Sequence, residues 1–243
     1  PSKKSIITFY YFFVEKFLIK KISLFITNSN FQKKLLTKFR NIDSKKIRVI
    51  LNPIKINQVK KNKNKNKLNI CTISRLDQSK NIETIIKSIK FIKKKTKKFK
   101  LDILGSGNYR EKLRELTIKE NIDKYVNFRG FLNSKQLEGY LKNKAKIFIF
   151  ASTQEGLPYS ILESMNFNVP VIAIKFGGIS SIFKNGKHIL YINKNDSFLI
   201  AKKILELNNN IKLQNNLKKN ASYELAKNFD RNKIHKQFLK IIK

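Results

Sequence analysis

From Leu68 onward, short apolar runs alternate with amphipathic stretches, and this alternation constrains the fold more than any other feature of the sequence. Strands and helices that take turns predict βαβ units, in which parallel strands pair and helices cover the sheet. The runs at 146–151 and 169–174 lack an in–out alternation, as expected of strands covered on both faces. We therefore predict an α/β fold with a Rossmann-like parallel sheet and helices on both faces.

Apolar periodicity and turn residues set the expected limits of these elements. Strands are predicted at 68–74, 99–104, 125–130, 145–152, 169–175 and 188–192. Helices are predicted at 81–95, 109–121, 134–143, 158–167 and 178–184, followed by terminal helices at 196–208, 211–227 and 230–242. Asp196 and Asp230 suit the N-cap positions of two terminal helices.

The residues before Leu68 follow a different pattern. They predict a helix at 5–21, a strand at 24–28, a helix at 30–39 and a strand at 46–51, before Asn52-Pro53 interrupts the pattern. Residues 60–67, KKNKNKNK, are polar and charged and predict a solvated linker. The expected divisions are 1–54 (the end of a first domain and a hinge), 55–67 (linker), 68–225 (main domain) and 226–243 (a C-terminal helix packing back on the N-terminal part).

The formal net charge of +37 raises the possibility of a basic nucleic-acid-binding protein. Only seven of the 53 basic residues are Arg, however, and phosphate and base recognition favour Arg. We therefore interpret most of the charge as a solvated Lys surface and expect no specific nucleic acid partner. An anionic membrane surface remains a possible partner, since the basic helix at 5–21 carries Phe12, Phe13 and Phe17, although core packing explains these residues as well.

Several features predict the compartment. The sequence has no run of about 18 uncharged apolar residues and no visible signal peptide. The single cysteine, Cys71, lies in a strand-like run and is expected to be buried. We therefore expect a reducing, cytoplasmic location, which includes a peripheral position at the inner face of the membrane.

The segment EGLPYSILE, residues 155–163, carries a candidate site at a strand end, where parallel sheets bind ligands. Pro158 suits the first turn of a helix, which places Glu155 in the preceding loop and Glu163 in the second turn. The amides of Gly156, Leu157 and Tyr159 are expected to be unpaired first-turn donors that face the same crevice. Two carboxylates can accept hydrogen bonds from a polyhydroxy ligand. The alternative is a purely structural role, in which Glu163 is an exposed helix residue and Glu155 caps the helix.

Other strand-end loops add weaker signals. Arg75 and Lys80 flank a loop that leads into a helix, and two cations at a helix N-terminus suit a pyrophosphate, although either could be a surface residue. Gly105 and Gly107 permit close backbone approach to a ligand, and an ordinary tight turn explains them equally well. The pair Gly177-Gly178 also precedes a predicted helix.

In order and spacing, these pieces resemble the donor-binding domain of the family 4 retaining glycosyltransferases, which have the two-domain GT-B fold. The matching segments are Ser74-Arg75-Leu76 with Lys80, Ile103 to Gly107, Val126 to Gly130, Phe150 to Ser152, Glu155 to Pro158, Leu162 to Met165, Val169 to Ala173, and Gly177-Gly178. Asn168 stands where the family usually has Gly; Asn is the next-best residue for a left-handed conformation. The resemblance implies that residues 1–54 are the remnant of a second Rossmann-like domain and that the chain is N-terminally truncated.

The resemblance also implies roles for individual residues. Arg75 and Lys80 would hold the diphosphate of a nucleotide sugar and stabilise it as it leaves, and Glu155 would orient the donor sugar, so these three are the candidate catalytic residues. Glu163 would bind the ribose hydroxyls. The remaining candidate donor-binding residues are Gly156, Leu157, Pro158, Gly105, Gly107 and Phe131. No metal and no cofactor are expected, since the two cations neutralise the leaving group.

The resemblance implies a glycosyltransferase that moves a sugar from a nucleoside-diphosphate sugar to a glycan or lipid-linked acceptor, with retention of anomeric configuration. Two alternatives remain open at this point. The chain could be a nucleotide-sugar-binding fragment without turnover, because the acceptor half of the expected cleft is missing. Less favoured is the basic nucleic-acid-binding protein.

Overall fold

The computed structural model describes residues 17–57, 68–152 and 155–242, and the chain divides between Leu51 and Asn52 into two units. The first unit holds a helical turn at 17–21, followed by β1 (Phe25–Thr27), α2 (Asn30–Arg40), η1 (Ser44–Lys46) and β2 (Ile47–Val49). The two strands are parallel, so β1, α2 and β2 form one βαβ unit. The predicted helix residues 5–16 lie outside the described residues.

Local contacts explain why α2 forms where it does. The Ser29 Oγ accepts a hydrogen bond from the Gln32 backbone N–H at 3.2 Å, which caps the helix N-terminus. At the other end Asn41 adopts a left-handed conformation with φ 51°. The Lys33 Nζ donates to the Ile47 carbonyl at 2.9 Å and so ties the helix to β2.

The second unit is built on a six-stranded, entirely parallel sheet with the order β5-β4-β3-β6-β7-β8. The strands are β3 (Leu68–Ile73), β4 (Phe99–Leu104), β5 (Val126–Gly130), β6 (Ile147–Phe150), β7 (Val171–Ile174) and β8 (Leu190–Ile192). The strand order reverses between β3 and β6, and such a switch point leaves a crevice at the carboxyl ends of the strands. The predicted α/β fold with a parallel sheet is confirmed.

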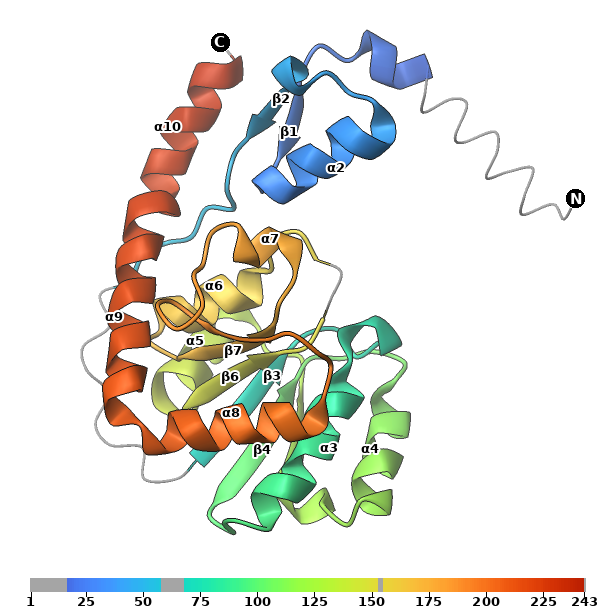
Figure 1. The fold of residues 1–243 in the computed structure, drawn as a ribbon, viewed down its shortest axis with the longest axis vertical. Coiled ribbons are helices and arrows are strands. Elements are labelled where there is room, and N and C mark those ends of the chain that lie inside the picture. The colour runs from blue at the N-terminus through green and yellow to red at the C-terminus, as the bar shows by residue number, and fades with distance from the viewer. Residues whose placement is uncertain (1–16, 58–67, 153–154, 243) are drawn as a thin grey trace, which may run out of the picture. The chain divides into compact units, whose positions relative to one another are not determined.

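Helices cover both faces of this sheet (Figure 1). The helices are α3 (Ile82–Lys93), α4 (Arg110–Lys119), α5 (Ser134–Asn143), α6 (Tyr159–Asn166), α7 (Gly177–Ser180), α8 (Ser197–Asn209), α9 (Ile211–Asn228) and α10 (Arg231–Ile242), with short 3-10 turns η2 (Gln78–Lys80) and η3 (Asp123–Tyr125). The helices α3, α4 and α8 pack together on one face, whereas α5 and α6 lie on the other and α9 packs against α6.

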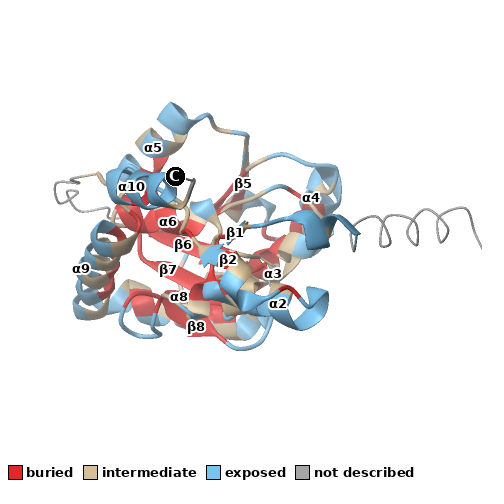
Figure 2. Ribbon diagram, turned by 90° about the horizontal axis from the view of Figure 1, so that it is seen from above, coloured by how far each residue is buried: buried red, intermediate tan, exposed pale blue. Residues whose placement is uncertain are grey.

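The inner strands of this sheet are buried (Figure 2), and side chains pack on both of its faces. All four residues of β6 are buried: Ile147 and Ile149 belong to the cluster under α3 and α8. Phe150 lies on the opposite face, where its ring centroid is 5.8 Å from that of Phe176. Burial of alternate residues in opposite layers explains why this strand shows no in–out alternation, as the sequence predicted.

Most predicted boundaries agree with the structure to within two residues, and the N-cap roles of Asp196 and Asp230 are confirmed. The helix predicted at 178–184 is wrong at its C-terminal end, because α7 ends at Ser180. There the buried His188 Nδ1 accepts from the Lys184 backbone N–H at 3.1 Å, and Gly186 turns the chain with φ 71°. This local contact, between residues four positions apart, stabilises a turn in place of a further helical turn.

The segment that enters the second unit is fastened along α6. The Asn52 Nδ2 donates to the Leu157 carbonyl at 2.8 Å, just before α6 begins. At the far end of α6, the Asn166 side chain accepts from the Asn57 N–H at 3.1 Å and donates to the Lys55 carbonyl at 2.9 Å. Both ends of the helix that carries Glu163 are thus held by one strand-like segment.

Three predictions concern residues or relationships that the structure does not describe. The linker at 60–67 lies outside the described residues, as do Phe12 and Phe13. The packing of 226–243 on the N-terminal part concerns how the two units lie, and it stays a prediction. Cys71 is buried as expected, and among the described helices none combines the length and apolar character of a membrane span.

Candidate functional site at the carboxyl ends of β3 and β6

The loops that follow β3, β4 and β5 are joined at the carboxyl edge of the sheet. The Leu76 N–H donates to the Ser106 carbonyl at 2.8 Å, and the Gly105 N–H donates to the Gly130 carbonyl at 2.7 Å. A Cβ on Gly105 would lie 1.9 Å from the Ser74 carbonyl oxygen, and one on Gly107 would lie 2.3 Å from that of Leu76. Both glycines are therefore required for the loops to pack against one another.

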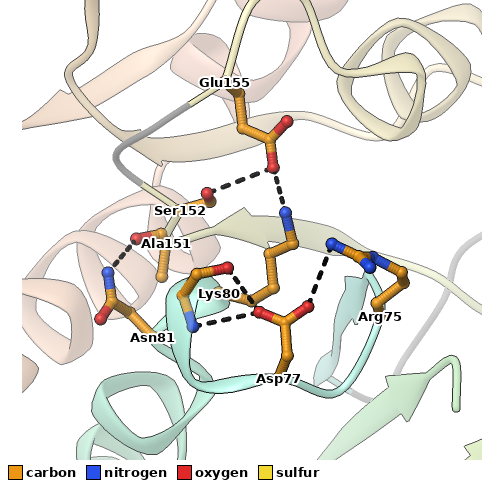
Figure 3. Close-up of polar contacts among 8 residues, drawn as sticks. Arg75, Asp77, Lys80, Asn81, Ala151, Ser152 and Glu155 are labelled. Atoms are coloured by element: carbon orange, nitrogen blue, oxygen red, sulfur yellow. Dashed lines mark hydrogen bonds and ion pairs between the residues drawn. The ribbon is translucent and has the colours of Figure 1, made fainter. Parts of the chain in front are cut away.

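Lys80 and Glu155 meet across the switch point, although 75 residues separate them (Figure 3). Lys80 ends η2 after β3, and Glu155 lies in the loop after β6. The Lys80 Nζ donates to the Glu155 Oε1 in an ion pair, and the Ser152 Oγ donates to the same oxygen at 3.3 Å. The two charged side chains are only 14% and 25% exposed, so the pair is partly shielded from water.

Arg75 lies at the rim of this region and is 80% exposed. Its Nη2 is 3.3 Å from the Asp77 Oδ2. Asp77 is held by Ser79, whose backbone N–H donates at 3.1 Å and whose hydroxyl also donates to the carboxylate. The hydrogen bond from the Ser79 hydroxyl is the main cause that lowers the pKa of Asp77; burial raises it, and Arg75, Lys80 and the Ser79 backbone N–H lower it further. The Asp77 carboxylate therefore stays charged and holds the Arg75 guanidinium beside the loop.

Glu163 lies in the second turn of α6, as predicted, and is half-buried. Burial raises the pKa of its carboxyl group. Within the described ranges, the Glu163 side chain forms no hydrogen bond and no ion pair with the protein. A carboxylate in this setting has its acceptor oxygens available for a ligand.

The segment before α6 differs from the prediction in one respect. Pro158 is the N-cap residue, with ψ 129°, and the helix begins at Tyr159. The Gly156 and Leu157 amides therefore precede the first turn of the helix instead of belonging to it. Their loop packs tightly on α7, where a Cβ on Gly178 would lie 1.5 Å from the Gly156 carbonyl oxygen.

Phe131 follows β5 and is 75% exposed. It is placed two strands away from β3, at the end of the sheet order, after Gly130 with φ 72°. The structure thus brings Lys80 and Glu155 into contact and leaves Phe131 on the rim. Its role in donor binding stays a prediction, as do the roles of Gly105 and Gly107.

Sequence reasoning missed three residues that shape this site: Asp77, Asn81 and Ser152. The sequence signal for Asp77 was present, because Asp followed two residues later by Ser favours a local side-chain turn. No local signal identifies the Asn81 contact, in which Nδ2 donates to the Ala151 carbonyl at 3.1 Å across two strands. Among the described residues no group of three or more His, Cys, Asp or Glu side chains is arranged to hold a metal ion.

Comparison with known sequences gives consistent matches. The model of the family described as "Glycosyl transferases group 1" matches residues 53–223. A poly(ribitol-phosphate) alpha-N-acetylglucosaminyltransferase of Staphylococcus aureus is 32% identical over 174 residues, which cover 69% of this chain and 34% of the relative. An alpha-1,4-N-acetyl-D-galactosaminyltransferase of Campylobacter jejuni, named for an undecaprenol-linked GalNAc acceptor, is 28% identical over 202 residues, covering 82% of this chain and 55% of the relative.

Solved structures match as well. A mutant of S. aureus TarM in complex with Fondaparinux, alpha-GlcNAc-glycerol and UDP matches with a TM-score of 0.82 and 25% identity, over 93% of this chain and 45% of that one. Anabaena HepE in complex with UDP and glucose matches with a TM-score of 0.80 and 20% identity, over 90% of this chain and 62% of that one. The chain spans between 24% and 55% of the length of the curated relatives compared.

Proposed function

This chain belongs to the glycosyl transferases group 1 family, and we propose that it binds a nucleoside-diphosphate sugar at the carboxyl ends of β3 and β6. In this proposal the protein transfers the sugar to a glycan or lipid-linked acceptor with retention of anomeric configuration and without a metal. The location that fits these substrates is the cytoplasm, including the inner face of a membrane.

The contact between Lys80 and Glu155 is the observation that carries the proposal. A diphosphate leaving group accumulates negative charge as the bond to the sugar breaks, and fixed cations stabilise that charge best where water is excluded. Lys80 is a partly shielded cation, and Arg75 adds a second cation at the rim. Glu155, beside Lys80, is placed to accept hydrogen bonds from the sugar hydroxyls when Lys80 turns to the phosphates.

The half-buried position of Glu163 supports the nucleoside part of the proposal. Its carboxylate has no protein partner in the described ranges, and a ribose offers two adjacent hydroxyls that can donate to its two oxygens. Burial raises the pKa of Glu163, and hydrogen bonds from the ribose would offset the cost of keeping its charge. UDP occurs in both of the matched complexes, which favours uridine as the base.

Isothermal titration of the whole chain with UDP, GDP and ADP tests this function. We expect binding of one diphosphate, and we expect Glu163→Ala to weaken it roughly tenfold to a hundredfold, as for the loss of hydrogen bonds to a charged group. Glu138→Ala is the matched control, because Glu138 is exposed on α5. Unchanged affinity in Glu163→Ala would contradict the assignment of Glu163.

The second candidate function is donor binding without turnover, because the four residues assigned above, Arg75, Lys80, Glu155 and Glu163, all serve the donor and none is assigned to an acceptor. Release of UDP from UDP-GlcNAc or UDP-glucose, measured with and without an added glycan acceptor, distinguishes the two. Release that depends on the acceptor supports transfer, and the anomeric configuration of the product tests retention. Tight binding with no release supports the binding-only function.

A further inference from the structure

Asn81 fastens the loop that carries Lys80 to the end of β6. It lies between η2 and α3, at the N-cap of α3, where an Asn side chain ordinarily accepts from its own helix. Here the side chain makes no capping bond. Its Nδ2 donates instead to the Ala151 carbonyl at 3.1 Å (Figure 3).

The neighbours of this hydrogen bond are the residues of the ion pair. Lys80 directly precedes Asn81, and Ser152, which donates to Glu155, directly follows Ala151. Asn81 is half-buried and Ala151 is 2% exposed, so water competes weakly for the bond. The Asn81–Ala151 hydrogen bond thus fixes the distance between the two backbone segments that carry Lys80 and Glu155, at a point close to both side chains.

Two requirements select Asn at this position. The backbone has φ 53° and ψ 32°, a left-handed conformation that Asn and Gly adopt at low cost and Ala does not. The cross-strand bond requires a side-chain donor, which Gly lacks. A Gly variant therefore removes the hydrogen bond and preserves the backbone conformation.

We propose that Asn81 is a positioning residue, which holds the Lys80 ammonium where the diphosphate of the donor binds. This inference rests on the proposed function, because it assigns Lys80 to the diphosphate. It predicts that Asn81 affects the phosphate-dependent part of the affinity and leaves the nucleoside part unchanged.

The test compares the binding of UDP and UMP to the whole chain by isothermal titration. If the wild type prefers another base, GDP and GMP or ADP and AMP take their place. In Asn81→Gly we expect the ratio of the UMP to the UDP dissociation constant to fall about threefold to tenfold, the range for one hydrogen bond. The affinity for UMP should stay at the wild-type value.

Asn121→Gly is the matched control. Asn121 also has φ 53°. Its side chain is exposed and forms no hydrogen bond with any described residue. The residue comes before β5, which is an edge strand, so it lies away from β3 and β6. This variant should keep the wild-type ratio, and thermal unfolding of both variants measures any general loss of stability.

Three results would overturn the inference. A wild-type ratio in Asn81→Gly would show that Lys80 needs no such positioning. An equal loss for UMP and UDP would assign Asn81 a merely structural role. If the wild type binds none of the nucleotides, the proposed function fails and the inference fails with it, whereas the first two results leave the proposed function standing.

Discussion

At the scale of single residues, the Lys80–Glu155 pair joins two groups that the proposed reaction uses separately. In the structure each charge is compensated by the other, and Ser152 supports Glu155. An incoming diphosphate carries more negative charge than one carboxylate, so it can replace Glu155 as the partner of Lys80. Glu155 then has its acceptor oxygens available for the sugar. The pair keeps both groups oriented, which lowers the cost of ordering them when the donor binds.

His188 provides a prediction about pH. Its Nδ1 accepts from the Lys184 N–H, which requires the neutral imidazole. Burial lowers the pKa of His188 below its usual 6.5; Glu224, 4.0 Å from Nε2, raises it, and Lys187 and Lys184 lower it. Because the pKa of His188 is lower in the folded than in the unfolded state, folding favours the neutral imidazole. The resulting contribution to stability is complete above the unfolded pKa and is lost as the pH falls through the folded pKa.

We therefore expect His188→Gln to have a flatter dependence of melting temperature on pH below 6.5 than the wild type, measured by thermal unfolding in matched buffers. His235→Gln is the control, because His235 is exposed on α10 and should leave the wild-type profile in place. Parallel profiles for His188→Gln and the wild type would contradict the prediction.

At the scale of elements, the tight contact between α7 and the loop before α6 supplies a second prediction. A Cβ at position 178 would lie 1.5 Å from the Gly156 carbonyl oxygen and 3.2 Å from that of Glu155. Gly178→Ala must displace the loop that holds Glu155, and such overpacking costs about 1–3 kcal/mol. We expect a lower melting temperature together with weaker UDP binding.

Gly139→Ala is the control for this substitution. Gly139 lies within α5, and a Cβ added there would have no atom within 4 Å, so Ala should stabilise the helix by about 0.5–1 kcal/mol. Unfolding and UDP titration of both variants provide the comparison. Wild-type stability and affinity in Gly178→Ala would show that the loop does not depend on this contact.

The sequence predicts the elements well where burial on both faces dictates the pattern, as in β6 and β7. It fails where a side chain from beyond the element stabilises a turn instead, as His188 does after α7. For Gly105 and Gly107 the sequence left contact with a ligand and a tight turn equally open, and it could not reveal that the nearest atoms are the carbonyls of Ser74 and Leu76. The Asn81 bond was missed for the same reason, because its partner lies 70 residues away.

At the scale of the whole molecule, the net charge of +37 is a property of the surface and not of the site. Lys80 is partly shielded, whereas lysines such as Lys94 and Lys119 are exposed to solvent. A strongly positive surface attracts anions from a distance and raises association rates at low salt. In the proposed function the charge would therefore assist the capture of a nucleotide, and the strand-end loops would define where it binds.

The four residues that the proposal assigns to the donor, Arg75, Lys80, Glu155 and Glu163, all lie in the unit from Asn52 to Lys243. Donor binding can therefore be measured on this chain as it is.

A crystal structure of the chain with UDP tests the central claim most directly. The account predicts a diphosphate within hydrogen-bonding distance of the Lys80 Nζ, with the ribose hydroxyls on the Glu163 carboxylate and the Lys80–Glu155 pair opened. UDP bound at another surface, with that pair intact and Glu163 without a ligand, would contradict it.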